Sequence, residues 1–302
     1  MLVLGAGGIL GEAWMSALLA GIAEESGFDP RRCDGFVGTS AGSIVAAMLS
    51  AGVDPRSGLG RFPEQPPAGA GEPARGAGPA SRALRLSGRL GGRATSAVAP
   101  ALLRGSIPGG RLVRRAALGR TPQGQRSLEG LGRMIEEAGA DWDGRLRITA
   151  VELESGRRVV FDGSGEPRLS VAEAVQASCA IPGVFRPLAA GGRRYVDGGA
   201  WSLTNMDVAE AGRGTRVLCL NPTGAISASR LGALGLVGSA SRSAAAIEAA
   251  ALRRRGTRVL TAAPDRQAAA AIGGNLMDPS RRQSVVAAGR AQGRRLARGE
   301  TT

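Results

Sequence analysis

The chain has 302 residues, of which 43% are hydrophobic, and this is enough to build a sizeable core. Its formal net charge is +14, all 39 basic residues are arginines, and the sequence contains neither lysine nor histidine. The composition therefore excludes Ser-His-Asp and Cys-His relays, histidine zinc sites, lysine Schiff bases and phosphate-binding lysines. Any catalysis must use serine, threonine, cysteine, acidic residues, arginine, tyrosine or backbone amides.

The excess of arginine has two explanations. Guanidinium groups bind phosphate, so the first explanation is binding to nucleic acid or to an anionic membrane. The stronger explanation is a composition bias, because arginine replaces lysine along the whole chain, beside heavy use of alanine and glycine. Aromatic residues, at 3%, are too few for the stacking platforms of single-strand binders. We expect no nucleic-acid partner.

Cysteine usage and hydropathy predict a cytoplasmic protein. Cys33, Cys179 and Cys219 are widely spaced and form no CxxC pair, which predicts buried free thiols and neither a disulfide framework nor a metal site. The N-terminus lacks a charged leader and a cleavage site, and no run reaches about 18 uninterrupted apolar residues.

The first fifty residues contain two strand–turn–helix units. Residues 2–4 form a short apolar run before a glycine-rich turn, and apolar residues recur at helical intervals from Glu12 to Glu25. A second strand is predicted at 33–37, followed by a turn at 38–42 and an apolar helix at 43–50. Two such units in succession predict an α/β fold with a parallel sheet.

The segment from about 54 to 124 has a different composition. Prolines are clustered there among glycine, alanine and arginine, and strand-like runs are absent from its sequence. We interpret it as an irregular or helical cap inserted at the end of the sheet, with some helix between 82 and 118. A disordered linker over 60–80 is an equal alternative.

Regular patterns return after residue 145. A hairpin is predicted from strands at 146–153 and 157–161, and a helix at 171–179 that ends before Pro182. The remaining predicted elements are a strand ending at Asp197, a buried strand at 217–220, an alanine-rich helix at 239–254, a strand at 258–261 and a basic helix at 279–298.

Residues 38–42, Gly-Thr-Ser-Ala-Gly, match the G-x-S-x-G nucleophile elbow. In that motif Gly38 and Gly42 allow a turn sharp enough to hold Ser40 above the end of a strand. The motif alone is weak in a chain with 48 glycines, but here a strand precedes it and an apolar helix follows. Ser40 thus lies at a helix N-terminus, where unpaired amides favour negative charge. The alternative is a glycine-rich turn with a capping serine.

The glycines from Gly5 to Gly11 have three interpretations. A dinucleotide fingerprint, G-x-G-x-x-G, would need a glycine where Leu10 stands. An oxyanion hole would use the amides around Gly7 and Gly8 to stabilise a tetrahedral intermediate. The third interpretation is a tight turn without a further role.

Without histidine, the base for Ser40 must be a carboxylate. Asp197, followed by Gly198 and Gly199, lies where a predicted strand ends in a flexible turn. A carboxylate with an ordinary pKa is a weak base towards serine, so the site would need to be dry and hold the hydroxyl in a short hydrogen bond. Asp-Gly-Gly is also common in plain turns, and this alternative stays open.

Taken in order, these three motifs resemble those of the patatin-like phospholipase family, which is known for a Ser/Asp dyad without histidine. Residues 177–185, Ala-Ser-Cys-Ala-Ile-Pro-Gly-Val-Phe, are similar to the family's A-S-x-A-x-P-x-x-F stretch, and residues 195–199, Tyr-Val-Asp-Gly-Gly, follow closely. The resemblance spans Met1 to Pro222.

The resemblance implies a three-layer α/β/α sandwich with a mainly parallel central sheet. It implies that Ser40 is the nucleophile and that Asp197 is first the base and then the acid. The backbone amides of Gly7, Gly8 and Ile9 are the implied oxyanion donors. The implied reaction is hydrolysis of a lipid or other acyl ester through an acyl-enzyme intermediate, without a metal or cofactor.

The chain departs from the family pattern at two positions. Leu10 stands where the family usually has arginine or lysine before Gly11, so a positive charge near the acyl site is lost. Asn205 lies near the asparagine that the family has after Asp-Gly-Gly, but Met206 replaces the usual proline.

We therefore predict a cytoplasmic or membrane-peripheral acyl hydrolase. Its catalytic domain would span 1–222, and a C-terminal helical segment with one strand, 223–302, would pack on the same domain. Arginine clusters at 111–115, 253–255 and 290–298 are candidate contacts with an anionic membrane, against the alternative of a solvated surface. Two other functions stay open: a Rossmann-type nucleotide-binding oxidoreductase and a non-catalytic lipid-binding module of the same fold.

Overall fold

The computed structural model describes residues 1–57, 110–225 and 233–300. Its described part contains one mixed sheet in the order β5-β6-β3-β2-β1-β7-β8, with β4 also paired to β3. Strands β1, β2, β3, β7 and β8 run parallel, whereas β4, β5 and β6 pair antiparallel with their neighbours. The strands are β1 (Leu2–Leu4), β2 (Phe36–Thr39), β3 (Leu146–Glu152), β4 (Arg158–Phe161), β5 (Leu188–Ala190), β6 (Arg193–Asp197), β7 (Arg216–Leu220) and β8 (Arg258–Ala262).

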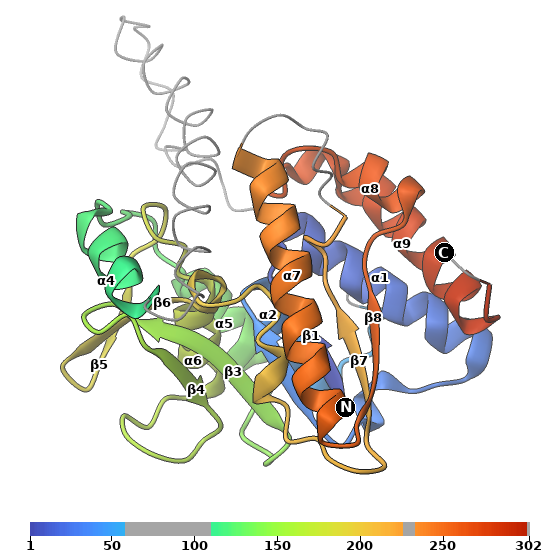
Figure 1. The fold of residues 1–302 in the computed structure, drawn as a ribbon, viewed down its shortest axis with the longest axis horizontal. Helices are drawn as coiled ribbons and strands as arrows, with labels where there is room; N and C mark the ends of the chain where they lie inside the picture. Colours follow the sequence, from blue (N-terminus) through green and yellow to red (C-terminus); the bar gives the residue numbers. More distant parts are fainter. Residues whose placement is uncertain (58–109, 226–232, 301–302) are drawn as a thin grey trace, which may run out of the picture.

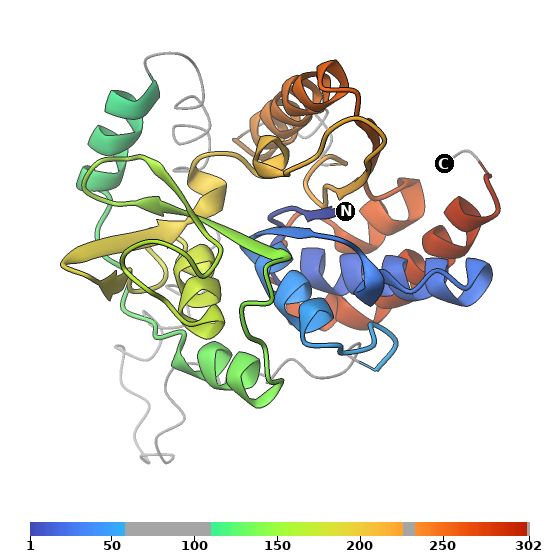
Figure 2. The same cartoon turned by 90° about the horizontal axis from the view of Figure 1, so that it is seen from below.

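Helices cover both faces of the sheet (Figure 1). In Figure 2, α4 and α7 lie on one side of the sheet and the other helices lie on the opposite side. The predicted three-layer α/β/α sandwich with a mainly parallel sheet is therefore confirmed. The helices are α1 (Gly8–Ser26), α2 (Ala41–Ser50), α4 (Gly110–Arg120), α5 (Glu129–Glu137), α6 (Val171–Cys179), α7 (Ala233–Arg254), α8 (Arg266–Ile272) and α9 (Arg282–Ala297).

The central strands are apolar on both faces because each face is covered. Leu2 and Leu4 of β1 belong to the core beneath α1, whereas Val3 points to the opposite face and packs in the core beneath α7. Helix α1 is buried from Leu10 to Ile22 because it lies between the sheet and α9. This packing fixes the N-terminus of α1 at the end of β1.

Most predicted elements are present, several with shifted ends. Helix α6 has the predicted bounds, but α1 begins at Gly8 rather than Glu12, and β2 begins at Phe36 rather than Cys33. The elements α5, β5 and α8 were not predicted. Most of the expected cap lies outside the described residues, which include 54–57 and 110–124 of it, with the helix α4. The three cysteines are free and buried, as predicted.

Two strands follow one another along the same side of β3. Strand β2 runs parallel to β3 and ends with Thr39 opposite Thr149. Strand β6 approaches from the other direction and ends with Asp197 opposite Ala150. Because Thr149 and Ala150 are neighbours, the last residues of β2 and β6 face each other across a short gap.

Candidate active site

The turn between β2 and α2 holds Ser40 in an unusual backbone conformation. Its φ of 52° and ψ of −122° place a non-glycine residue in a region that L-residues rarely adopt. The turn also packs tightly on β1, since a Cβ atom on Gly42 would lie 1.9 Å from the Leu4 carbonyl oxygen. The sequence therefore produces the sharp strand-to-helix turn that the G-x-S-x-G pattern predicts, with Ser40 at the start of α2.

Ser40 and Asp197 are hydrogen-bonded, although 157 residues separate them in the chain. Ser40 Oγ donates to Asp197 Oδ2 at 2.6 Å, and both residues are buried. The other carboxylate oxygen, Oδ1, accepts from the backbone N–H of Gly199 at 2.7 Å. The strand order of the sheet brings the two residues together, because Ser40 comes directly after β2 and Asp197 is the last residue of β6.

Burial raises the pKa of Asp197 to about 6, even though hydrogen bonds from Ser40 and Gly199 favour the ionised form. A buried carboxylate binds a proton more tightly than an exposed one because burial disfavours its charge. Asp197 is therefore a stronger base than an ordinary aspartate, and it is still ionised at neutral pH. These are the properties required of a group that takes a proton from a serine hydroxyl.

The glycine loop after β1 presents unpaired backbone donors at the start of α1. The N–H of Gly5 donates to Leu220 O and that of Ala6 to Leu203 O. Among the described residues, by contrast, the N–H groups of Gly7, Gly8 and Ile9 have no hydrogen-bond acceptor. The first turn of a helix leaves such groups free, and the helix dipole adds partial positive charge there.

Contacts between backbones bring this loop beside the other two motifs. A Cβ atom on Gly42 would also lie 2.9 Å from the Gly5 carbonyl oxygen, and one on Gly199 would lie 3.5 Å from the Ala6 side chain. The loop thus borders both the Ser40 turn and the Asp197 turn. The other motif glycines lie at this edge of the sheet as well: Gly11 in the first turn of α1, Gly38 in β2, and Gly198 directly after Asp197.

Leu10, which stands where the family usually has a basic residue, does not face this loop's open side. Its side chain is fully buried in the core, and its N–H donates to the carbonyl oxygen of Leu276 at 3.0 Å. A contact with the C-terminal part of the chain therefore holds the backbone at Leu10.

Ser178 supports the Ser40 turn, and sequence reasoning assigned it no role. Its Oγ accepts from the backbone N–H of Ser40 at 2.8 Å and donates to the carbonyl oxygen of Thr149 at 2.7 Å. Ser178 thus ties the Ser40 turn to β3 from α6. The neighbouring Cys179 is buried against Ser43, with Sγ and Oγ 3.8 Å apart, and burial raises the pKa of its thiol. The A-S-x-A stretch was the available signal, but its spacing alone did not indicate a contact with Ser40.

Asn205 links β2 to the loop that follows Asp197. It is fully buried, and its Nδ2 donates to Thr39 Oγ1 at 3.1 Å and to the Ser202 carbonyl oxygen at 2.6 Å. Thr39 Oγ1 in turn lies 2.9 Å from Thr149 Oγ1. With Met206 in place of the family's proline, Asn205 therefore still connects these two segments, a role that its position in the sequence did not indicate.

Several arginines of two clusters have partners within the fold, and membrane contact by these clusters stays a prediction. Arg114 is fully buried, donates to the carbonyl oxygens of Gly156 and Ala200, and stacks on Trp201. In the C-terminal cluster, Arg290 and Arg294 pair with Glu24 of α1, Arg295 pairs with Asp265, and Arg298 pairs with Glu25. These side chains join elements of the fold, whereas Arg253, Arg254 and Arg255 remain exposed.

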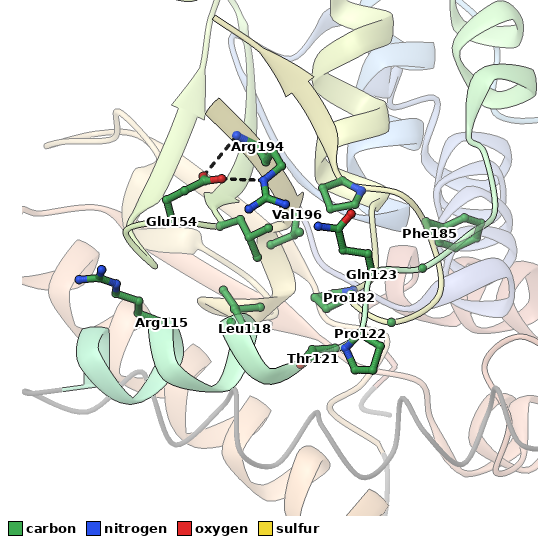
Figure 3. A pocket seen from close by; sticks show the side chains of 15 residues that line it. Arg115, Leu118, Thr121, Pro122, Gln123, Glu154, Pro182, Phe185, Arg194 and Val196 are labelled. Carbon is green, nitrogen blue, oxygen red and sulfur yellow. Dashed lines mark hydrogen bonds and ion pairs between the residues drawn. The ribbon is translucent and has the colours of Figure 1, made fainter. Parts of the chain in front are cut away.

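A cavity of about 200 Å³ lies between residues of α4 and β6 (Figure 3). Leu118, Pro182, Phe185 and Val196 contribute its apolar walls, while Arg115 and the hydrogen-bonded pair of Glu154 and Arg194 contribute charge. Val196 and Asp197 are adjacent in β6, so their side chains point to opposite faces of the sheet. Val196 therefore lines the cavity from the side of β6 opposite Asp197.

Two further features bear on cofactors and membranes. Over residues 1–57, 110–225 and 233–300, no three Cys, Asp or Glu side chains are grouped as metal ligands would be. The same residues include no helix with the length and apolarity needed to cross a bilayer.

Comparison with known proteins gives one family match. The family model described as patatin-like phospholipase matches residues 2–210, close to the span of the sequence resemblance. Among curated proteins, the sequence has no match. Similar solved structures include VipD from Legionella pneumophila (16% identity, TM-score 0.43) and the type III effector protein ExoU (16% identity, TM-score 0.35). The alignments cover 99% of this chain but only 66% of VipD and 53% of ExoU.

Proposed function

Because the chain belongs to the patatin-like phospholipase family, we propose that it is a serine lipid acyl hydrolase in which Ser40 and Asp197 form the catalytic dyad. The observation that carries the proposal is the buried hydrogen bond of 2.6 Å between Ser40 Oγ and Asp197 Oδ2. The family favours lipid hydrolysis over the nucleotide-dependent alternative.

In the first step Ser40 Oγ attacks the carbonyl carbon of the ester, and its proton passes to Asp197 Oδ2. The carbonyl oxygen becomes an oxyanion, which the free N–H groups of Gly7, Gly8 and Ile9 stabilise. Collapse of this intermediate breaks the bond to the alcohol, which leaves with the proton from Asp197. The acyl group then remains as an ester on Ser40.

In the second step water attacks the acyl-enzyme, and Asp197 accepts a proton from the water. The second tetrahedral intermediate uses the same donors, and its collapse releases the carboxylic acid and returns the proton to Ser40 Oγ. The scheme needs one group that is basic near neutral pH, and the raised pKa of Asp197 supplies it. An ester is the expected substrate because its leaving alcohol requires less help than an amine.

Active-site labelling tests the proposal. A fluorophosphonate probe should attach to Ser40, as located by peptide mapping, and p-nitrophenyl esters should be hydrolysed. Ser40→Ala should abolish both, and Asp197→Asn should reduce turnover nearly as much because the two groups act as a unit. No label and no hydrolysis by a folded protein would refute the proposal and favour a lipid-binding module. Stabilisation by NAD(P) in a thermal-shift titration would favour the oxidoreductase alternative.

A further inference from the structure

The turn between α8 and α9 places Met277 directly on the glycine loop. The N–H of Leu10 donates to the carbonyl oxygen of Leu276 at 3.0 Å. A Cβ atom on Gly8 would lie 2.8 Å from Met277 Sδ and 2.9 Å from the same carbonyl oxygen. Gly8 therefore has no room for a side chain, and Met277 packs against the backbone between the free N–H groups of Gly7 and Ile9.

Hydrogen bonds within the turn fix the position of Met277. Its N–H donates to Asn275 Oδ1 at 3.0 Å, and Asp278 Oδ1 accepts from the N–H of Ser280 at 3.1 Å. The following helix, α9, is held close to α1, since a Cβ atom on Gly293 would lie 2.1 Å from the Leu18 carbonyl oxygen. The side chain of Met277 is nevertheless 36% exposed.

A part-buried ion pair adds to this anchoring. Arg282 at the start of α9 contacts Glu12 at 2.6 Å, and Glu12 is only one turn from the free N–H groups of α1. The Met277 turn and the N-terminus of α1 are therefore parts of one fixed arrangement.

Other half-buried apolar residues border the same loop. The carbonyl oxygen of Leu203 accepts a hydrogen bond from the N–H of Ala6 at 2.7 Å. The Cδ2 atom of Leu203 would lie 3.3 Å from a Cβ atom on Gly199. Ile9 belongs to the loop itself and is half-buried. Ile9, Leu203 and Met277 thus come from three distant parts of the chain to the edge of one backbone loop.

We propose that Met277 is a specificity-determining residue that forms one wall of the acyl-chain site. This inference rests on the proposed function, because it assumes that the N–H groups around Gly8 receive the carbonyl oxygen of an ester. The carbons next to that carbonyl then lie close to Met277. An alkyl chain gains free energy by leaving water for an apolar wall, and the flexible methionine side chain adapts to its shape. Met277 lies outside the family match, so the C-terminal part of the chain sets the preference.

Chain-length preference tests this role. We would compare kcat/KM for p-nitrophenyl octanoate and p-nitrophenyl acetate in Met277→Gln, which keeps the side-chain length but makes it polar. The variant should lose about fourfold or more on octanoate, the equivalent of roughly one buried methylene group, with little change on acetate. Met277→Leu should restore the parental ratio of the two substrates.

Phe28→Ala is the matched control. Phe28 is 39% exposed, comparable to Met277, but it follows the far end of α1, about 28 Å along a helix of this length. It should leave the octanoate-to-acetate ratio at the parental value.

The outcomes separate the two proposals. If the parent labels at Ser40 and hydrolyses both esters, but Met277→Gln keeps the parental ratio, the role of Met277 is refuted and the proposed function stands. An equal loss on both esters, with a lower melting temperature, also refutes it, because that result describes a structural residue. If the folded parent neither labels nor hydrolyses, the proposed function fails and this inference fails with it.

Discussion

Replacing Asp197 by asparagine should stabilise the protein at neutral pH while removing its activity. The carboxylate is buried, and the pKa rises from 3.8 to about 6 on folding. Each unit of pKa difference corresponds to about 1.4 kcal/mol, so the ionised side chain costs the folded state about 3 kcal/mol. Asparagine keeps the shape of aspartate without its charge and is free of this cost.

The sign of the effect follows from proton binding. The folded protein binds the Asp197 proton more tightly than the unfolded chain, so this group's favourable contribution is fully present below about pH 4 and is lost as the pH rises through about 6. Asp197→Asn lacks this dependence. The difference in unfolding free energy between variant and parent should therefore grow by about 3 kcal/mol between acidic pH and pH 8.

Urea unfolding of both proteins at several pH values measures this difference. Ser40→Ala is the matched control, since it is equally inactive but keeps the buried carboxylate, and it should show no such growing gain in stability. A difference between Asp197→Asn and the parent that stays constant over the whole pH range would refute the reasoning. It would mean that Asp197 is not buried as a charged group.

Three further predictions follow from the same site. The value of kcat/KM for a short ester should fall about tenfold per pH unit below about pH 6, because only ionised Asp197 accepts the Ser40 proton. A pH–rate profile that is flat through this range would contradict that role. Ser40→Gly should be about 1 kcal/mol more stable to urea than Ser40→Ala, because glycine tolerates the φ of 52°; equal stability would show that the turn is unstrained. Ser178→Ala should lower kcat about tenfold, because it leaves the Ser40 N–H unpaired. Ser50→Ala, at the other end of α2, should leave kcat unchanged, and equal kcat values for the two variants would show that Ser178 does not position Ser40.

Local patterns predicted the pieces of this molecule well. The glycine loop, the elbow and helix 171–179 could be predicted because turn residues, apolar periodicity and the proline after the helix are all local signals. Strand β5 was missed because it has three half-exposed or exposed residues that pair only with β6. Helix α8 was missed because its seven residues are mostly alanine, which gives no amphipathic pattern.

The site itself depends on contacts that no local pattern encodes. Asp197 was chosen because histidine is absent and because of the family resemblance, whereas its partnership with Ser40 depends on which strands pair with β3. The Ser178 bond to the Ser40 turn spans 138 residues, and the packing of Met277 on Gly8 joins the two ends of the chain. Spacing in the sequence does not indicate either contact.

The shared side of β3 has a consequence for how activity appears during folding. Strands β1 and β2 can pair early because they are close in sequence, but Asp197 reaches Ser40 only after β6 has taken its place where β2 ends. Long-range pairing of this kind is slow, since a long loop must close first. During refolding, ester hydrolysis should therefore appear only after the sheet is complete. A partly folded chain in which the parallel strands have already paired should show no hydrolysis.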